Sequence, residues 1–156
     1  MQLGALYGRP LVHHIRGWVA GWIYDVWLDP AAGQVAAFEV CEPDRMQFRC
    51  VAPFTVSRSL RYGLAVDIDP EMWQVLERGM RWTSVRNLGE VAVVTSDGEW
   101  SCGVTDAECD PETWQLTSFR LHRRWWEIFA RRILAADRVI GSGADVLVVA
   151  HTWKNP

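Results

Sequence analysis

The sequence predicts an all-β protein built from two tandem small antiparallel β-barrels that are joined by a short helical linker. Three observations support this fold class: a long internal repeat, turn signals at matching places in both copies, and short apolar runs between the turns. The repeat assigns residues 1–69 to the first barrel, 70–83 to the linker and 84–156 to the second barrel. Five or six short strands in each copy are enough to curl into a small barrel.

The internal repeat aligns residues 8–38 with residues 89–119 at a constant offset of 81, without a gap. Eight of the 31 aligned positions are identical, and most of them are turn formers or apolar anchors. A period this long exceeds the roughly 20 to 50 residues of solenoid repeats, so each copy is expected to be a small domain of its own. The identical pairs are Gly8/Gly89, Val12/Val93, Gly17/Gly98, Asp25/Asp106, Asp29/Asp110, Pro30/Pro111, Gln34/Gln115 and Phe38/Phe119.

Turns are expected at the same places in both copies. In an Asp-Pro turn the carboxylate accepts from a backbone N–H and proline presets φ, while Gly33 supplies the left-handed residue. The second copy has Trp114 at that position, and tryptophan rarely adopts a left-handed conformation. This second turn is therefore expected to close differently, or Trp114 to begin the next strand. The predicted structural turn residues are Gly17, Asp25, Asp29 and Pro30, with Gly98, Asp106, Asp110 and Pro111.

Strands of the first copy are expected over residues 11–15, 19–28, 34–42, 46–56 and 64–68. The strand over 19–28 is apolar on both faces, which predicts that it is covered on both sides or strongly bent. Residues 125–140 have helical propensity, but their alignment with the strand at 46–56 favours strands. In the linker, Asp69-Pro70-Glu71 has the cap, the first-turn proline and the acid of a helix start, so a helix to about residue 81 is expected.

The order of these elements resembles the PRC-barrel family, which is named for the cytoplasmic domain of the photosynthetic reaction centre H subunit and also includes the C-terminal domain of RimM. The resemblance covers nearly the whole chain except the linker, and it departs at Cys102 and Trp114, where the first copy has glycine. It implies small barrels that act as adaptors on larger assemblies and carry no catalytic residues. The matching residues of the first copy are Gly8, Val12, Gly17, Gly21, Ile23, Asp25, Asp29, Pro30, Gly33 and Gly63, and those of the second are Gly89, Val93, Asp97, Gly98, Val104, Asp106, Asp110, Pro111, Ile140, Gly141, Asp145 and Val146.

The bulk composition argues against several functional classes. The net charge of −3 does not favour general nucleic-acid binding, which requires a positive footprint. No secretory signal pattern and no apolar run of transmembrane length is present, so a cytoplasmic protein is expected, with the cytoplasmic membrane face as the alternative location. The four cysteines show neither a CxxC pair nor zinc-finger spacing, and they are interpreted as thiols of a reducing compartment.

No enzyme activity, cofactor or metal is expected. Asp25 with Asp29, and Asp106 with Asp110, could offer carboxylates to calcium, but such residues usually cap backbone donors, and a hard cation needs six or more oxygens. His13 and His14 are neighbours on a strand and point to opposite faces, so they cannot chelate together. Neither a recognisable nucleophile motif nor a glycine-rich phosphate loop is present.

Tryptophan is unusually frequent, with ten copies, and two small cores cannot hide so many. Trp73 and Trp82 bracket the linker, and they are expected to wedge between the barrels, which would then unfold in one transition that Trp82→Ala lowers strongly. One basic and aromatic cluster is expected to bind a partner, although a solvated strand edge explains it equally well. Its residues are Arg120, Arg123, Arg124, Trp125, Trp126, Arg131 and Arg132.

The favoured function is therefore that of a non-enzymatic adaptor or assembly subunit, which docks through a Trp/Arg-rich barrel surface onto a larger protein complex. One alternative is a peripheral cytoplasmic subunit of a membrane complex similar to a photosynthetic reaction centre. The other alternative is an RNA-linked ribosome maturation factor, against which the acidic net charge speaks.

Overall fold

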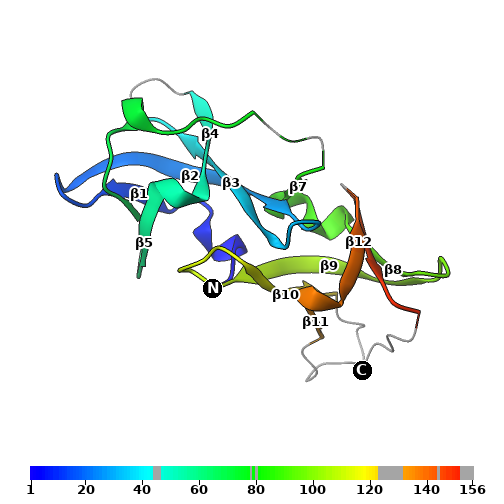
Figure 1. Cartoon of the computed structure of the whole chain (residues 1–156). Coiled ribbons are helices and arrows are strands. Elements are labelled where there is room, and N and C mark those ends of the chain that lie inside the picture. Colours follow the sequence, from blue (N-terminus) through cyan, green and yellow to red (C-terminus); the bar gives the residue numbers. More distant parts are fainter. Residues whose placement is uncertain (44–46, 78, 80, 123–131, 144, 152–156) are drawn as a thin grey trace.

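The computed structural model contains two curled β-sheets of the same design, one in each repeat (Figure 1). It describes residues 1–43, 47–77, 79, 81–122, 132–143 and 145–151. The all-β class is confirmed, because strands dominate and the helical segments in these ranges are short 3-10 helices. No helix in the described ranges is long and apolar enough to cross a membrane. The 3-10 helices are η1 (Gly4–Leu6), η2 (Pro53–Thr55), η3 (Pro70–Met72), η4 (Val85–Glu90) and η5 (Ala136–Arg138).

The two sheets share one strand order. The first runs β4-β3-β2-β1-β6-β5, with β7 added beside β2, and the second runs β11-β10-β9-β8-β13-β12. Apart from β7, each strand of the first sheet therefore has a counterpart at the same place in the second, as expected of a tandem repeat. The strands of the first sheet are β1 (Pro10–His13), β2 (Trp18–Asp29), β3 (Gln34–Cys41), β4 (Phe48–Val51), β5 (Val56–Leu60), β6 (Gly63–Val66) and β7 (Thr83–Ser84). Those of the second are β8 (Ala92–Thr95), β9 (Trp100–Cys109), β10 (Leu116–Leu121), β11 (Ile133–Ala135), β12 (Val139–Ser142) and β13 (Val146–Val149).

One pair of strands in each sheet is parallel, so the prediction of purely antiparallel sheets was wrong. β1 pairs with β6 and β8 pairs with β13 in the parallel direction, while the other pairs are antiparallel. A parallel pair needs a long connection, and here four strands lie between its two members in the chain. Among the described residues no strand pairing joins β4 to β5 or β11 to β12, so the strands alone close neither sheet into a barrel.

The linker differs from the helix that the sequence predicts over residues 70–81. Among the residues of this range that the structure describes, only η3 is helical, and the chain then pairs with β4 at residues 74–76. The backbone N–H of Leu76 donates to the carbonyl of Cys50 at 2.8 Å, and that of Ala52 donates to Gln74 at 3.3 Å. The edge strand β4 offers unpaired backbone groups to the linker, and pairing with them outweighs the local helix signal.

Two strand predictions also need correction. The strand expected over 46–56 ends at Val51, because Pro53 lacks an N–H and opens η2 instead; the chain then enters a separate strand, β5. Within the stretch 125–140, residues 133–135 do form a strand, paired with β10, as the repeat predicts. Residues 125–131 lie outside the described part of the chain.

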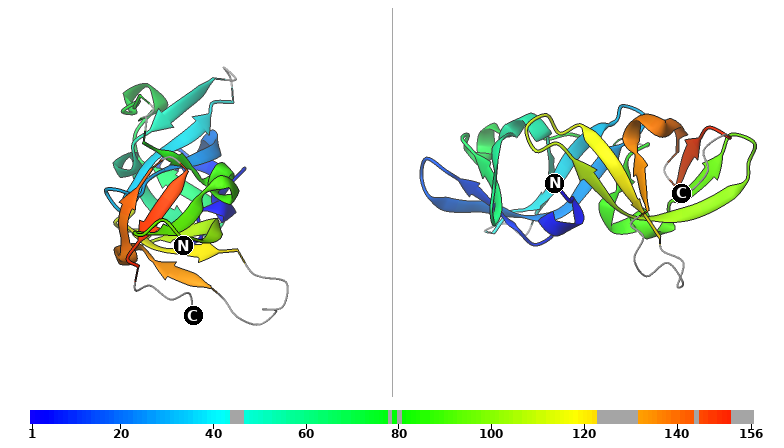
Figure 2. Two further views of the ribbon diagram at one scale, coloured as in Figure 1. Left: turned by 90° about the vertical axis from the view of Figure 1, so that its right-hand side faces the viewer. Right: turned by 90° about the horizontal axis from the view of Figure 1, so that it is seen from below.

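The first segment of each repeat lies on the sheet of the other repeat. At the N-terminus, Leu3 donates its N–H to Ala107 of β9 at 2.9 Å, and Cys109 donates to Met1 at 2.9 Å. Reciprocally, β7 at the start of the second repeat pairs with Trp27 and Leu28 on β2. The two repeats thus exchange their opening segments, and the two sheets lie side by side (Figure 2).

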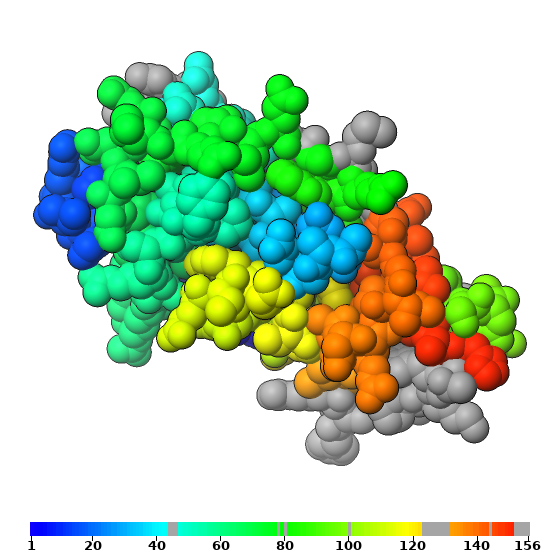
Figure 3. Space-filling model, viewed as in Figure 1, coloured from blue at the N-terminus to red at the C-terminus, as the bar shows by residue number. Residues whose placement is uncertain are grey.

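The hairpin turns of the two repeats also meet each other. Val35 donates to the carbonyl of Trp114 at 2.9 Å, and Leu116 donates to the carbonyl of Gly33 at 2.8 Å. Both the donors (116 − 35) and the acceptors (114 − 33) differ by the repeat offset of 81, so these two bonds are equivalent. The repeats are therefore related by a local twofold axis between the turns. In Figure 3 residues of the second turn (yellow) lie against the first repeat.

Trp114 occupies the left-handed position of the second turn, contrary to the expectation that this turn closes differently. Its φ is 60°, close to the 66° of Gly33. The ring is 6% exposed and packs edge-on against Phe38 of the first repeat, with centroids 4.9 Å apart. A left-handed residue costs roughly 1–2 kcal/mol, whereas a buried tryptophan contributes about 3–5 kcal/mol. Packing between the repeats therefore holds Trp114 in a conformation that its own backbone disfavours.

Trp114 places its ring between the two repeats, which is the position that the sequence predicts for the linker residues Trp73 and Trp82. Trp82 packs with Leu76 on a cluster formed by Trp27, Ala36 and Ala37 of the first sheet. Trp73 is buried, and its indole N–H donates to the carbonyl of Ile68 at 3.2 Å. The linker runs along β4, so the contacts shown for Trp82 and this bond of Trp73 lie within the first repeat and the linker.

Candidate functional site

The outer side of the first sheet carries three partly exposed aromatic side chains, which we call the aromatic face: Trp22, Tyr24 and Phe48. Trp22 pairs with Cys41 on β3, and Cys41 pairs with Phe48 on β4, so these side chains form one row on one side of the sheet. Tyr24 lies at a bulge of β2, and its ring contacts Phe48 with centroids 4.6 Å apart. The three residues are 45%, 42% and 51% exposed.

The linker covers only the neighbouring part of this side of the sheet. Leu76 and Trp82 lie over Trp27 and Ala37, which are buried beneath them. Of the two alternatives predicted for β2, cover on both sides is found at Trp27 but not at Trp22 and Tyr24, which lie beside a bulge of the strand. The aromatic face remains open to solvent because the linker does not extend over it.

Arg86 of the second repeat completes this surface. Its guanidinium lies 4.1 Å from the ring centroid of Tyr24 and 5.1 Å from that of Tyr7. It belongs to η4, the segment that the second repeat places on the first sheet. An arginine over aromatic rings gains cation–π energy and keeps its donors free for a partner. The aromatic face with Arg86 is therefore built from both repeats.

Asp25 fixes the position of Arg86. This carboxylate is 4% exposed and accepts from the hydroxyl of Ser84 and from the N–H of Val26. Ser84 in turn caps η4 by accepting from the backbone N–H of Arg86 at 3.1 Å. Burial, and then the nearby charge of Asp25, raise the pKa of Tyr7 far above its usual range, so its hydroxyl stays protonated.

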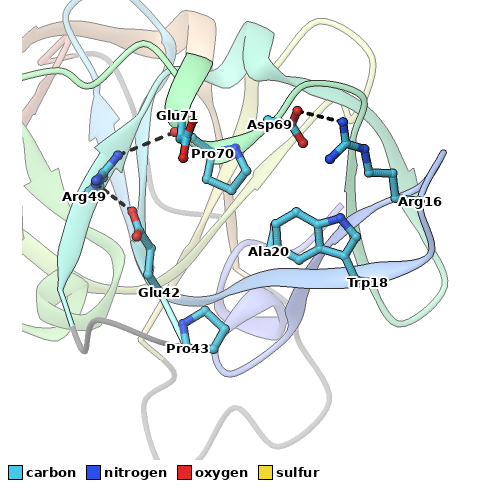
Figure 4. Close-up of a pocket in the computed structure, with 9 residues that line it drawn as sticks. All are labelled: Arg16, Trp18, Ala20, Glu42, Pro43, Arg49, Asp69, Pro70 and Glu71. Atoms are coloured by element: carbon cyan, nitrogen blue, oxygen red, sulfur yellow. Dashed lines mark hydrogen bonds and ion pairs between the residues drawn. The ribbon is translucent and has the colours of Figure 1, made fainter.

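A second feature is a charged pocket at the open end of the first curled sheet (Figure 4). Trp18 and Ala20 of β2 form one wall, and Asp69, Pro70 and Glu71 at the start of the linker lie across from them. The pocket has a volume of about 300 Å³. Two ion pairs flank it: Arg49 Nε lies 2.6 Å from Glu42 Oε1, and Arg16 Nη2 lies 3.0 Å from Asp69 Oδ2. The remaining lining residue is Pro43.

Of the partner-binding cluster expected from the sequence, Arg120 and Arg132 lie in the described part of the chain, so the cluster as a whole stays a prediction. Arg120 holds Glu108 with Nε and Nη2, at 3.0 and 2.7 Å from Oε1, across β10 and β9. Arg132 is buried at 8% exposure. The other members lie outside the described part of the chain: Arg123, Arg124, Trp125, Trp126 and Arg131.

Most of the expected turn residues serve turns, but two of them do not. Gly17 and Gly98 adopt the left-handed region, with φ of 70° and 90°. Asp29 and Asp110 accept from backbone N–H groups within their turns, and Pro30 and Pro111 follow them there. Asp25 and Asp106 instead lie within β2 and β9. Asp106 accepts from Gly4 at 3.0 Å, just as Asp25 receives Ser84, so both carboxylates hold an exchanged segment.

The sequence contained a signal for part of the aromatic face, but not for all of it. The even positions Trp18, Trp22 and Tyr24 are visible in the strand pattern, whereas their exposure depends on where the linker runs. The local sequence pattern does not predict that Phe48 and Arg86 lie beside Tyr24. Strand pairing brings Phe48 there, and the exchange of opening segments brings Arg86 there.

The described residues contain no group of three or more His, Cys, Asp or Glu side chains that could hold a metal ion. No protein-family model matches the chain, and no curated protein matches it. The arrangement of the aromatic face and the charged pocket is therefore the basis for the functional proposals.

Proposed function

We propose that this protein is a non-enzymatic adaptor, which docks on a larger protein complex through the aromatic face and Arg86. One observation carries the proposal: three adjacent aromatic side chains are two-fifths to one-half exposed on one side of a sheet whose neighbouring part is covered. Adjacent exposed aromatic residues with an arginine have the composition of binding hot spots. The partner surface is expected to be apolar, with an acidic group opposite Arg86.

The second repeat supports this assignment by contrast. At the repeat offset, Trp22 and Tyr24 correspond to Gly103 and Thr105 of β9. The same sheet therefore forms without aromatic residues at these places, so the fold does not demand them. Exposing these aromatic rings to water is unfavourable, and a partner that covers them would explain why they are present.

The PRC-barrel resemblance is part of this proposal, and it favours an adaptor. Its support is that motif residues take structurally demanding places: Gly8, Gly17, Gly33 and Gly98 have positive φ, and Asp25 and Asp106 hold the exchanged segments. Barrel-like closure of each sheet, and docking at a membrane complex, remain expectations that come with this resemblance.

Site-specific photocrosslinking tests the docking surface. A photoreactive phenylalanine analogue at position 48 is expected to capture one protein partner at equal stoichiometry, whereas the same analogue at the exposed Phe54 is not. With that partner purified, Trp22→Ser/Tyr24→Ser is expected to weaken binding at least tenfold. Phe54→Ser/Tyr62→Ser changes two exposed aromatic residues elsewhere and is expected to leave the affinity unchanged.

Four outcomes contradict the adaptor proposal. These are capture of only a second copy of this chain, equal capture from positions 48 and 54, loss of binding in both double variants, and no specific capture at all. Binding to anionic vesicles or to RNA that depends on the aromatic face, with no protein partner, would favour one of the two alternatives instead.

A further inference from the structure

We propose that the charged pocket binds a basic side chain, lysine or arginine, of a polypeptide partner. The pocket lies on the concave side of the first sheet, whereas the aromatic face lies on the outer side of the same sheet. In register, the row Ile23–Val40–Arg49 is the neighbour of the row Trp22–Cys41–Phe48, so its side chains point the opposite way. The inference is therefore independent of the aromatic face.

The size of the pocket fits a side chain. Its volume of about 300 Å³ lies at the lower end of the range for ligand sites, which is roughly 300–1,000 Å³. A single long side chain fits this space. Figure 4 shows the Glu42–Arg49 pair on one side and the Asp69–Arg16 pair on the other, with the Trp18 ring next to the second pair.

The charge balance of the lining favours a cation. Three carboxylates line the pocket, from Glu42, Asp69 and Glu71, against the two guanidinium groups of Arg16 and Arg49. The two arginines are paired with Glu42 and Asp69, while Glu71 has no ion pair among the described residues. An entering ammonium or guanidinium group would supply the charge that balances Glu71.

Trp18 offers the second element of cation recognition. Its ring is 38% exposed and lines the pocket, and indole is the strongest cation–π acceptor among the side chains. Stacking on the buried His13, with centroids 5.7 Å apart, holds this ring in place. His13 Nε2 in turn lies 3.4 Å from Asp69 Oδ1, so the aromatic wall and the acidic wall are joined. A fixed aromatic face beside carboxylates needs little rearrangement to receive a cation.

The fold does not require these residues. At the repeat offset, His13, Arg16 and Trp18 correspond to Val94, Asp97 and Glu99 of the second repeat, which forms a sheet of the same strand order without them. The aromatic and charged lining is therefore specific to the first repeat.

Binding of capped amino acids, followed by NMR on the ¹⁵N-labelled full chain, tests this proposal. Nα-acetyl-arginine methylamide and its lysine analogue are expected to shift the Trp18 indole resonance, with a Kd on the order of 1–10 mM because the contact is small. The Trp18→Phe variant identifies that resonance by its loss. Glu71→Gln is expected to weaken binding about fivefold, and Glu71→Arg to abolish it, while Glu77→Gln, in the linker but outside the lining, leaves it unchanged.

Uncharged and anionic probes give the opposing results. Equal binding of Nα-acetyl-norleucine methylamide would show that the pocket responds to apolar volume, and tighter binding of the glutamate analogue would make it an anion site. Either result overturns the proposal, as does the absence of any shift with the arginine and lysine probes. Because the readout is a small probe at Trp18, it is unaffected by success or failure of docking at the aromatic face.

Discussion

The two repeats have the same strand order but very different surfaces. Most of the residues that they share lie at turns or at the junction, by which we mean the contacts between the two repeats. They include left-handed glycines, the Asp-Pro turns, and the carboxylates Asp25 and Asp106 that hold the exchanged segments. The residues in which they differ include Trp22 and Tyr24 of the aromatic face, and His13, Arg16 and Trp18 at the charged pocket, all in the first repeat. Comparison within one chain thus separates residues that the shared fold requires from residues that only the first repeat has.

The junction itself is not fully symmetric. Gly33 and Trp114 occupy equivalent turn positions, but only Trp114 fills the space beside Phe38 with a ring. Asp25 is buried, whereas its counterpart Asp106 is half-buried. We therefore expect unequal effects from matched substitutions, and these effects test how the repeats hold each other.

The largest effect is expected at Trp114. Trp114→Ala removes the buried ring between the repeats and is expected to cost about 3–5 kcal/mol of unfolding free energy, measured by urea denaturation. Trp114→Gly loses the same ring but relieves the left-handed strain, so it is expected to be about 1 kcal/mol less destabilising than alanine. Trp82→Ala, at a half-buried site on the first sheet, should cost less than either.

Two findings would contradict this ranking. A loss at Trp82 equal to that at Trp114 would mean that the linker joins the repeats, as the sequence predicts. Two separate unfolding transitions in the wild-type protein would show that the exchanged segments and the shared core do not couple the repeats.

The exchanged segments should transmit damage to the opposite repeat. Leu3 is fully buried, and its truncation in Leu3→Ala is expected to cost about 2–4 kcal/mol. Hydrogen exchange should speed up first in β9 of the second sheet, to which this segment is paired. The matched Val85→Ala, in η4, should speed up exchange in β2 of the first sheet instead. Acceleration confined to each variant's own repeat would mean that the segments are not exchanged in solution.

The two carboxylates of the junction should differ in importance. Asp25→Ala leaves the Ser84 hydroxyl and the Val26 N–H without their acceptor in a buried place, and it is expected to cost about 2–3 kcal/mol. Asp106→Ala affects the N–H groups of Gly4 and Ala107 at a half-buried site, so a loss of about 1 kcal/mol is expected. Thermal unfolding of both variants measures the difference, and equal losses would show that burial does not set it.

The smallest effect is expected at the Glu108–Arg120 pair. Hydrogen bonds from Arg120 hold the pKa of Glu108 below its usual value of 4.5. A depressed carboxyl pKa stabilises the fold above that usual value, and this stabilisation is lost as the pH falls through the folded-state pKa. Since both side chains are partly exposed, Glu108→Gln should cost less than about 1 kcal/mol at pH 7. The difference from the wild type should vanish near pH 2.5, and a difference that persists there would assign the loss to packing.

Much of the fold was predictable from the sequence because turns and strand positions depend on residues that are close together in the chain. The offset of 81 predicts two equivalent units, and the Asp-Pro turns with Gly17 and Gly98 are found where the sequence places them. Strand positions followed from apolar runs between turns, with errors where Pro53 ends a strand. The prediction of a helical linker was wrong because one 3-10 turn satisfies the helix signal at residues 69–72. After that turn, the edge strand β4 offers backbone hydrogen-bond partners to the linker.

The sequence by itself determined the repeat, the β class and the turns, since each rests on residues that are neighbours along the chain. Tertiary structure alone decided the parallel pairs, the exchange of the opening segments and the left-handed Trp114, because these depend on contacts between residues far apart in sequence. It also decided the candidate sites. Trp22 and Tyr24 are exposed because of the path of the linker, and Arg86 reaches Tyr24 because β7 of the second repeat pairs with β2 of the first.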